Sequence, residues 1–190
     1  MLDKLSLVVI PMLGIMVALS FSISNVNAIV VNSGGLNATA FSIDIPDNWA
    51  YEQGILFSQI GLTPNEFGVM LVNHSKPLNE KMKDEGAYSS FTQEWDYPIK
   101  NAPLDVFVKY KIDKQDAINV TSKQNATIGN EIAVKIYADG TKSFSGIKFV
   151  EYFLMHNKEP YYIAYMANVK DFEKYLPEFE QIVKTFKFTK

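Results

Sequence analysis

The sequence contains no cysteine and no arginine, and only two of its residues are histidine. Without cysteine the chain has no disulfide, no thiol nucleophile and no thiolate metal site, and it lacks the lipidated cysteine of an exported lipoprotein. Without arginine it lacks the planar side chain that grips phosphate with two parallel hydrogen bonds. The lysines are spread among acidic residues rather than gathered in a basic block, so we expect no binding of nucleic acid.

The sequence also lacks the local motifs of common enzymes. There is no GxxxxGK[ST], no GxGxxG and no HExxH, which removes the usual signatures of nucleotide binding and of zinc hydrolases. His74 and His156 stand alone, whereas imidazole metal sites normally add further ligands nearby, so we expect both to be solvated. We therefore predict no catalytic residue and no bound cofactor, and a protein that is not an enzyme.

Residues 1–28 have the pattern of an export signal. Lys4 precedes the apolar run LSLVVIPMLGIMVALSFSIS, residues 5–24, and the small residue Ala28 ends a cleavage site. The run is about as long as the roughly 20 residues that span a bilayer, so an uncleaved N-terminal membrane anchor is the alternative. In both cases we expect everything after residue 28 to lie outside the cytoplasm, either secreted or anchored.

Four Asn-x-Ser/Thr tripeptides occur after the predicted signal, and each marks a candidate glycosylation site in a surface loop. The asparagines are Asn37, Asn73, Asn119 and Asn125. In a bacterial host we expect them to be unmodified. In an exported chain without cysteine, they favour an archaeal envelope.

The remaining chain is predicted to be a flexible linker, residues 29–38, followed by one domain, residues 39–190. In AFSIDIP the apolar residues alternate with polar ones, which is typical of a half-buried strand. Further runs have the length and composition of strands. They are residues 55–62, 67–72, 118–122, 131–138, 146–155 and 160–167.

Residues 73–102 break this pattern and are predicted to form a long polar connection. Phe91 and Trp95 either dock this loop onto the sheet or bind a partner. Deleting residues 78–98 is therefore expected to leave the fold intact and to abolish binding. Acidic side chains in the same stretch are candidate ligands for a hard cation such as calcium or manganese. These candidates are Asp84, Glu85, Glu94 and Asp96.

The end of the chain, NVKDFEKYLPEFEQIVKTFKFTK, has apolar residues at helical spacing and indicates one amphipathic helix. Asn168 is expected to cap its start, Pro177 to kink or divide it, and TFKF to add a short final strand. Residues 103–117 fit both a strand and a helical face, and periodicity alone does not decide between them.

Three segments together resemble the PsbP family and the wider Mog1/PsbP-like fold over residues 39–188. They are the opening F-x-I-x-x-P-x-x-W, the strand pair IKFVEYFLMHNKEPYYIAYMA and the closing FEKYLPEFEQIVKTFKF. The resemblance implies an α+β fold, an α/β/α sandwich with a central antiparallel sheet, in which residues 103–116 are helical. It also implies structural roles for Pro46, which fixes a turn, and Trp49, which closes it.

Members of that family are mostly exported or lumenal accessory proteins that dock on membrane complexes, and some are associated with calcium or manganese. The first hypothesis is therefore a non-catalytic module that binds a protein partner in the cell envelope, through the 73–102 segment or a sheet edge. The second is a carrier of a small molecule or divalent cation. The third is a glycan hydrolase that uses Asp44 with Glu52 or Asp47 as paired carboxylates.

Overall fold

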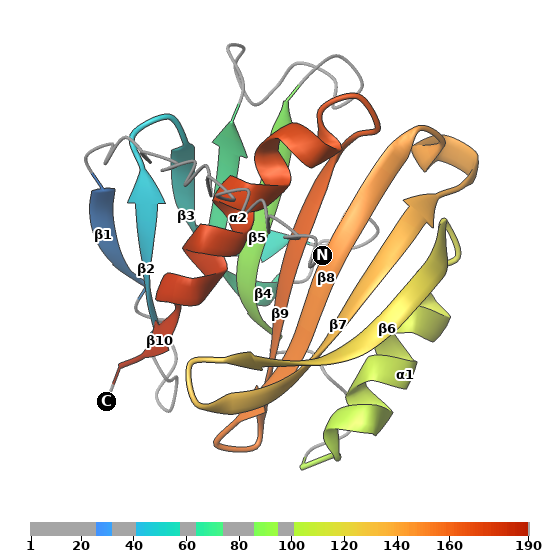
Figure 1. Ribbon diagram of the computed structural model, residues 1–190. Coiled ribbons are helices and arrows are strands. Elements are labelled where there is room, and N and C mark those ends of the chain that lie inside the picture. The colour runs from blue at the N-terminus through green and yellow to red at the C-terminus, as the bar shows by residue number, and fades with distance from the viewer. Residues whose placement is uncertain (1–25, 32–40, 58–63, 74–85, 95–100, 190) are drawn as a thin grey trace, which may run out of the picture.

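The computed structural model describes residues 26–31, 41–57, 64–73, 86–94 and 101–189, which form two antiparallel sheets, two α-helices and one 3-10 turn (Figure 1). The helices are α1 (Leu104–Lys114) and α2 (Phe172–Thr185), and η1 (Lys142–Phe144) is the 3-10 turn. The strands are β1 (Val26–Val31), β2 (Phe41–Pro46), β3 (Ala50–Phe57), β4 (Pro64–Asn73), β5 (Ala87–Glu94), β6 (Ile118–Ile128), β7 (Glu131–Gly140), β8 (Ile147–His156), β9 (Glu159–Asn168) and β10 (Lys187–Phe188).

The larger sheet has seven strands in the order β3-β4-β5-β9-β8-β7-β6, so β3 and β6 are its edges. Every neighbouring pair in it is antiparallel. The β8–β9 hairpin turns through Asn157 and Lys158, whose φ angles are 50° and 69°. Positive φ at both central residues is the type I′ geometry, which matches the twist of the flanking strands. The tips of the β6–β7 and β8–β9 hairpins lie together at the lower end of the molecule in Figure 1.

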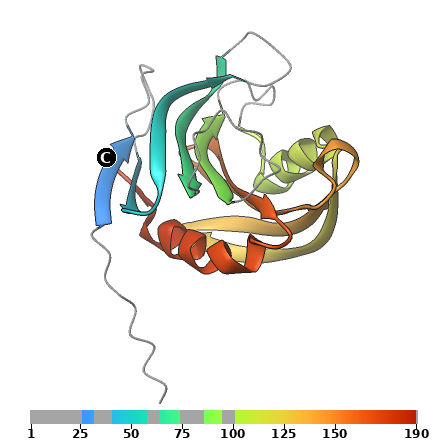
Figure 2. The same ribbon diagram turned by 90° about the horizontal axis from the view of Figure 1, so that it is seen from above.

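One helix covers each face of this sheet, as Figure 2 shows from above. On one face, Phe107 and Val108 of α1 pack with Phe153 of β8. On the other face, Phe179 and Ile182 of α2 pack in the largest buried cluster, which also holds core residues of β8 and β9. Because side chains alternate across a strand, neighbouring residues of β8 serve the two layers in turn. The predicted α/β/α sandwich with a central antiparallel sheet is confirmed.

The second sheet has three strands in the order β1-β2-β10 and packs into the same core as α2. Burial alternates along β2 as the sequence predicted, with Phe41, Ile43 and Ile45 inside. Ile29 of β1 lies opposite Ile43 and is also buried. The predicted linker at residues 29–38 is therefore wrong for residues 29–31, which belong to a paired strand, while residues 32–38 lie outside the described residues. The strand also includes the predicted cleavage site at Ala28.

The prediction of a long connection over residues 73–102 is also wrong, because β5 lies within it between β4 and β9. The sequence AYSSFTQE hides this strand because its buried positions include hydroxyl side chains. Ser89 Oγ donates to the carbonyl of Ala164, and Thr92 Oγ1 donates to that of Tyr162. These bonds offset the cost of burying the hydroxyl groups, so a polar segment fits a central strand.

Both helices fall where the sequence analysis placed them. α1 confirms the helical assignment for residues 103–116, which the resemblance implied over the alternating pattern. α2 is a single helix that continues through Pro177, so the predicted division into two turns is wrong. The prediction that Asn168 caps the start of α2 is wrong, because Asp171 is the N-cap residue. The side chain of Asn168 accepts a hydrogen bond from the amide of Lys170 at 3.0 Å. The final strand β10 confirms the one predicted in TFKF.

Candidate functional site

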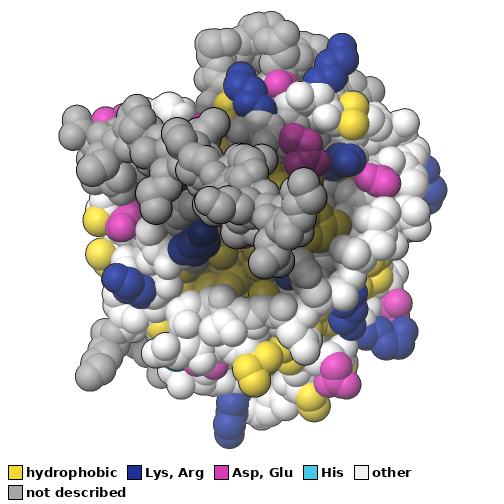
Figure 3. Space-filling view, viewed as in Figure 1, with side chains coloured by type: hydrophobic (Ala, Val, Ile, Leu, Met, Phe, Trp, Pro, Cys, Tyr) yellow, Lys and Arg dark blue, Asp and Glu magenta, His cyan; other side chains and the backbone are white. Residues whose placement is uncertain are grey.

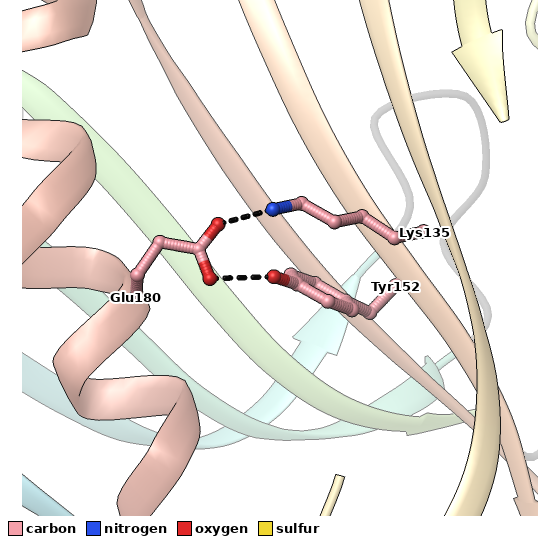
Figure 4. Close-up of polar contacts among 3 residues, drawn as sticks. All are labelled: Lys135, Tyr152 and Glu180. Atoms are coloured by element: carbon pink, nitrogen blue, oxygen red, sulfur yellow. Dashed lines mark hydrogen bonds and ion pairs between the residues drawn. The ribbon is translucent and has the colours of Figure 1, made fainter. Parts of the chain in front are cut away.

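A partly buried ion pair joins α2 to the sheet (Figure 4). Lys135 Nζ of β7 donates to Glu180 Oε1 at 2.5 Å, and Tyr152 Oη of β8 donates to Glu180 Oε2 at 2.7 Å. The ammonium group also lies 4.7 Å from the ring centre of Tyr137 and 5.2 Å from that of Tyr152. Burial, with the Glu180 carboxylate, raises the pKa of the Tyr152 hydroxyl far above its usual range, so this group stays protonated. Each charge is thus paired inside the fold, which fastens α2 to the sheet.

A second buried polar cluster lies beneath α1 on the opposite face. Glu151 of β8 is 2% exposed, and its Oε1 accepts from Tyr162 Oη at 2.6 Å and from Gln115 Nε2 at 3.1 Å. Gln115 Nε2 also donates to Tyr162 Oη at 3.1 Å. Burial raises the pKa of the Glu151 carboxyl, and the hydrogen bonds and the Lys111 charge offset this only in part.

The sequence analysis overlooked both clusters, although a signal was present. Lys135 and Glu151 are lone charged residues in the apolar strands IAVKIYA and FVEYF. Charged side chains are almost never fully buried without a partner, so a charge inside such a run indicates a buried pair.

The structure describes two of the three carboxylates of the hydrolase hypothesis, both at the end of β2. Asp44 lies in β2, where its backbone N–H donates to Thr185 Oγ1 at 2.8 Å, and Asp47 is exposed in the following turn. The side chain of Glu52 is outside the described residues. In the same turn, the amide of Trp49 donates to the carbonyl of Pro46 at 2.9 Å.

The ring of Trp49 is 3% exposed within the main core, and its Nε1 donates to Glu178 Oε2 at 2.8 Å. Asn48 Nδ2 donates to the same oxygen at 2.9 Å. A carboxylate that accepts from two side chains beside a buried indole joins the β2–β3 turn to α2. The contacts of residues 46–49 therefore indicate a structural role.

The predicted partner and metal residues are placed only in part. Phe91 is fully buried near Phe179 and Phe186, so of its two predicted roles the docking role fits the structure and the partner-contact role is wrong. Trp95, Asp84, Glu85 and Asp96 lie outside the described residues, as does the side chain of Glu94. Among the described residues, no three histidine or acidic side chains gather in a way that could hold a metal ion.

Two of the predicted glycosylation candidates lie on the edge strand β6. Asn119 and Asn125 are exposed, but they stand in a strand rather than in the predicted loops. Asn37 and the side chain of Asn73 are outside the described residues. Attachment of sugar at these asparagines stays a prediction.

The prediction that His156 is solvated is wrong, because its ring contacts other side chains at the end of β8. Its Nδ1 lies 2.6 Å from Glu131 Oε1, and its ring stacks on that of Phe188 with centroids 3.7 Å apart. The contact joins both hairpin tips to β10. His74 is outside the described residues.

Two hollows open beside these hairpin tips and share Asn130 and Glu131 in their lining. One has a volume of about 530 Å³ and is also lined by Ala102 to Leu104, Ile132, Met155 and Lys158. The other, about 500 Å³, is also lined by Gly129, His156, Lys184 and Phe186 to Phe188. We call the residues that line the two hollows the tip surface.

The tip surface combines apolar side chains, three lysines and one acid, Glu131, which is paired with His156. Ile132 is 74% exposed, the largest exposure among the large apolar side chains of the described residues. Lys158, Lys184 and Lys187 are exposed around it, whereas the chain as a whole has a net charge of −3. Figure 3 shows lysine and acidic side chains interspersed over the face that carries α2. The tip surface is therefore the best candidate for a contact with another molecule.

A smaller pocket lies between the start of α2 and strands β6 to β8. Its volume is about 250 Å³, and Tyr137, Phe172 and Leu176 are among its lining residues. Sites for small molecules usually measure about 300–1,000 Å³, so this pocket does not favour the carrier hypothesis.

The chain matches no family model and no curated protein. Its fold, however, is shared with solved structures. LpqN of Mycobacterium tuberculosis, described as involved in cell envelope biogenesis, is 11% identical with a TM-score of 0.56, over 88% of this chain and 93% of LpqN. The cyanobacterial PsbP (CyanoP) of Synechocystis sp. PCC 6803 is 8% identical with a TM-score of 0.54, over 90% of this chain and 96% of CyanoP. PA94 of Pseudomonas aeruginosa, a protein of unknown function, is 13% identical with a TM-score of 0.50, over 83% and 94% of the chains.

These likenesses confirm the PsbP-like fold that the sequence resemblance implied. At such low identities they establish the fold alone. In the described part of the chain, no helix is long and apolar enough to cross a membrane.

Proposed function

We propose that this protein is a non-catalytic accessory module outside the cytoplasm, and that its tip surface binds an acidic segment of a protein in the cell envelope. The observation that carries the proposal is the exposed Ile132 beside hollows rimmed by three lysines, on a chain that is acidic overall. An apolar anchor with a charged rim is the usual anatomy of a protein interface.

Two further observations support this function. Lys135, Glu180 and Glu151 all have partners within the fold, which supports a structural role for these charges. The fold is that of LpqN, which is described as involved in cell envelope biogenesis, and the N-terminal sequence has the pattern of an export signal. Fold likeness is an analogy, so the contact itself needs a direct test.

The test is charge reversal at the tip surface. The tagged full chain is purified from its native envelope in mild detergent, as the unchanged protein and as a variant that combines Lys158→Glu with Lys187→Glu. We expect the variant to recover about tenfold less of the partner, because charge complementarity across an interface is lost. The matched control is Lys170→Glu, an exposed lysine at the other end of β9.

Recovery should also fall as salt is raised, since exposed charges are screened over about 10 Å at 0.1 M ionic strength. Equal recovery of one protein by the tip variant and by the control would refute the assignment of the contact to this surface. Recovery of no protein by the unchanged chain would refute the accessory function.

A further inference from the structure

Two buried oxygen atoms in the cluster beneath α1 lack a hydrogen-bond donor from the described residues. They are Glu151 Oε2 and Gln115 Oε1. The two side chains already touch through their other polar atoms, because Gln115 Nε2 donates to Glu151 Oε1 at 3.1 Å. Leaving a buried acceptor without a donor destabilises the fold. Two such acceptors, one from each member of a contacting pair, call for a common explanation.

A single proton satisfies both atoms. If Glu151 is a neutral carboxylic acid with its proton on Oε2, it donates to Gln115 Oε1 while Gln115 Nε2 donates back to Oε1. The pair is then a cyclic acid–amide dimer that joins β8 to the residue capping the C-terminal end of α1. When the proton leaves, neither Glu151 Oε2 nor Gln115 Oε1 has a donor from the described residues and the carboxylate is a buried charge.

We propose that Glu151 and Gln115 form a proton-dependent latch that holds α1 on the sheet and thereby regulates the tip surface. α1 connects the two places: Gln115 caps one end, and Ala102 to Leu104 at the other end line the larger hollow. The helix of 11 residues spans roughly 16 Å, so a change in its seating moves that wall. The consequence for binding rests on the proposed function, whereas the latch itself does not.

Among the described residues, few other groups around Glu151 can control its charge. From α1 the ammonium of Lys111 faces the cluster, 4.3 Å from the centre of the Tyr162 ring. From β9 the hydroxyl of Tyr162 donates to the carboxyl. Opposite Glu151 in the sheet stand Ile136 of β7 and Ala164 of β9, which carry no charge.

The direction of the pH effect follows from burial, which raises the pKa of Glu151 in the folded protein. Protonated Glu151 makes its full contribution to the stability of the fold at a pH below the ordinary pKa of a glutamate. This contribution is lost as the pH rises through the raised pKa of the folded protein. The latch is therefore closed at low pH and opens as the pH rises.

The test compares hydrogen exchange of α1 amides at pH 5 and pH 8, corrected for the intrinsic exchange rate, in the full chain. We expect protection of residues 104–114 to fall at least about threefold at pH 8 in the unchanged protein. Glu151→Gln should show no such fall, because an amide N–H replaces the acid O–H and keeps the pair closed. Glu159→Gln, at an exposed glutamate that begins β9, is the matched control and should behave as the unchanged protein.

Two further measurements separate the latch from a general loss of stability. Gln115→Ala should lower α1 protection already at pH 5, and it should leave the exchange of β4 and β5 unchanged. Infrared spectra of protein with carbon-13-labelled glutamate should show, at pH 5, a protonated carboxyl that Glu151→Gln removes. Equal α1 protection in the unchanged protein and Glu151→Gln at both pH values would overturn the latch.

Partner recovery in the same variants tests the regulation. At pH 8 we expect Glu151→Gln to retain more of the envelope partner than the unchanged protein does. Equal recovery by the two proteins, with α1 protection differing, would overturn the regulatory part. If α1 protection titrates and no partner is recovered with any variant, the latch stands and the proposed function fails.

Discussion

At the scale of single residues, the charges inside the fold are the features that most need a physical account. Lys135 is 8% exposed and Glu151 is 2% exposed, and each lies in a strand of otherwise apolar residues. Burying a charge is costly unless it is paired and hydrogen-bonded. Lys135 meets this condition with a full carboxylate, whereas Glu151 meets it as a neutral acid. One sheet thus uses two solutions on its two faces.

The pairing of Lys135 with Glu180 leads to a prediction about stability. Glu180→Leu alone should lower the free energy of unfolding by about 3 kcal/mol, because it leaves the ammonium buried without its partner. Lys135→Met together with Glu180→Leu should recover most of that loss, since an apolar pair can replace a buried ion pair. Urea unfolding of the two single variants and the double variant measures this. Additive losses would show that the two side chains do not act as a pair.

At the scale of elements, β5 decides whether the 73–102 region is dispensable. Deleting residues 78–98, or residues 87–94 alone, removes a strand between β4 and β9 and the buried Phe91. We expect either deletion to abolish the cooperative unfolding transition, followed by circular dichroism on heating. Deleting residues 78–84 leaves every described strand whole and should preserve the transition. A cooperative transition in the chain without residues 87–94 would contradict the sheet order.

The strand β1 gives a second prediction at this scale. A chain that begins at residue 32 lacks β1, leaves β2 as an open edge and loses the buried side chain of Ile29. Burying such a side chain is worth about 1.5–3 kcal/mol, so this chain should unfold several degrees below one that begins at Val26. Differential scanning calorimetry measures the gap. Identical melting temperatures would mean that β1 adds nothing to the fold.

How far each element could be predicted depended on its environment. β2 and α2 were predictable because one side of each is buried. Apolar residues therefore recur about every two residues along β2 and every 3.6 residues along α2. The helical α1 was not decided by its pattern, and only the family resemblance assigned it correctly. β5 left no pattern because its buried hydroxyls bond to β9, and β1 was hard to distinguish from the apolar run beside it. The ion pair and the contact of Glu151 with Gln115 could not be located, because these partners are 28 to 45 residues apart in the chain, although Tyr162 is only 11 residues from Glu151.

At the scale of the whole molecule, paired polar groups lie between the helices and the sheet, and exposed basic groups lie at the tip surface. The ion pair of α2 and the acid–amide pair of α1 hold one helix on each face of the sheet. The two hairpin tips and β10 then meet at one end, where His156 stacks on Phe188 and the hollows open. The interior is thus fixed on both sides, and the exposed apolar and basic groups of the tips are presented on a rigid frame. A rigid frame of this kind suits a binding module.

The measurement that tests this account most directly is photocrosslinking in the native envelope. A photoreactive amino acid replaces Ile132 in the tagged full chain, and in a second chain it replaces Val169, which is 52% exposed at the opposite end of β9. We predict one discrete crosslinked protein from position 132, with little of it from position 169, and its loss when Lys158 and Lys187 are both changed to glutamate. Equal crosslinking from the two positions, or none from position 132, would contradict the account.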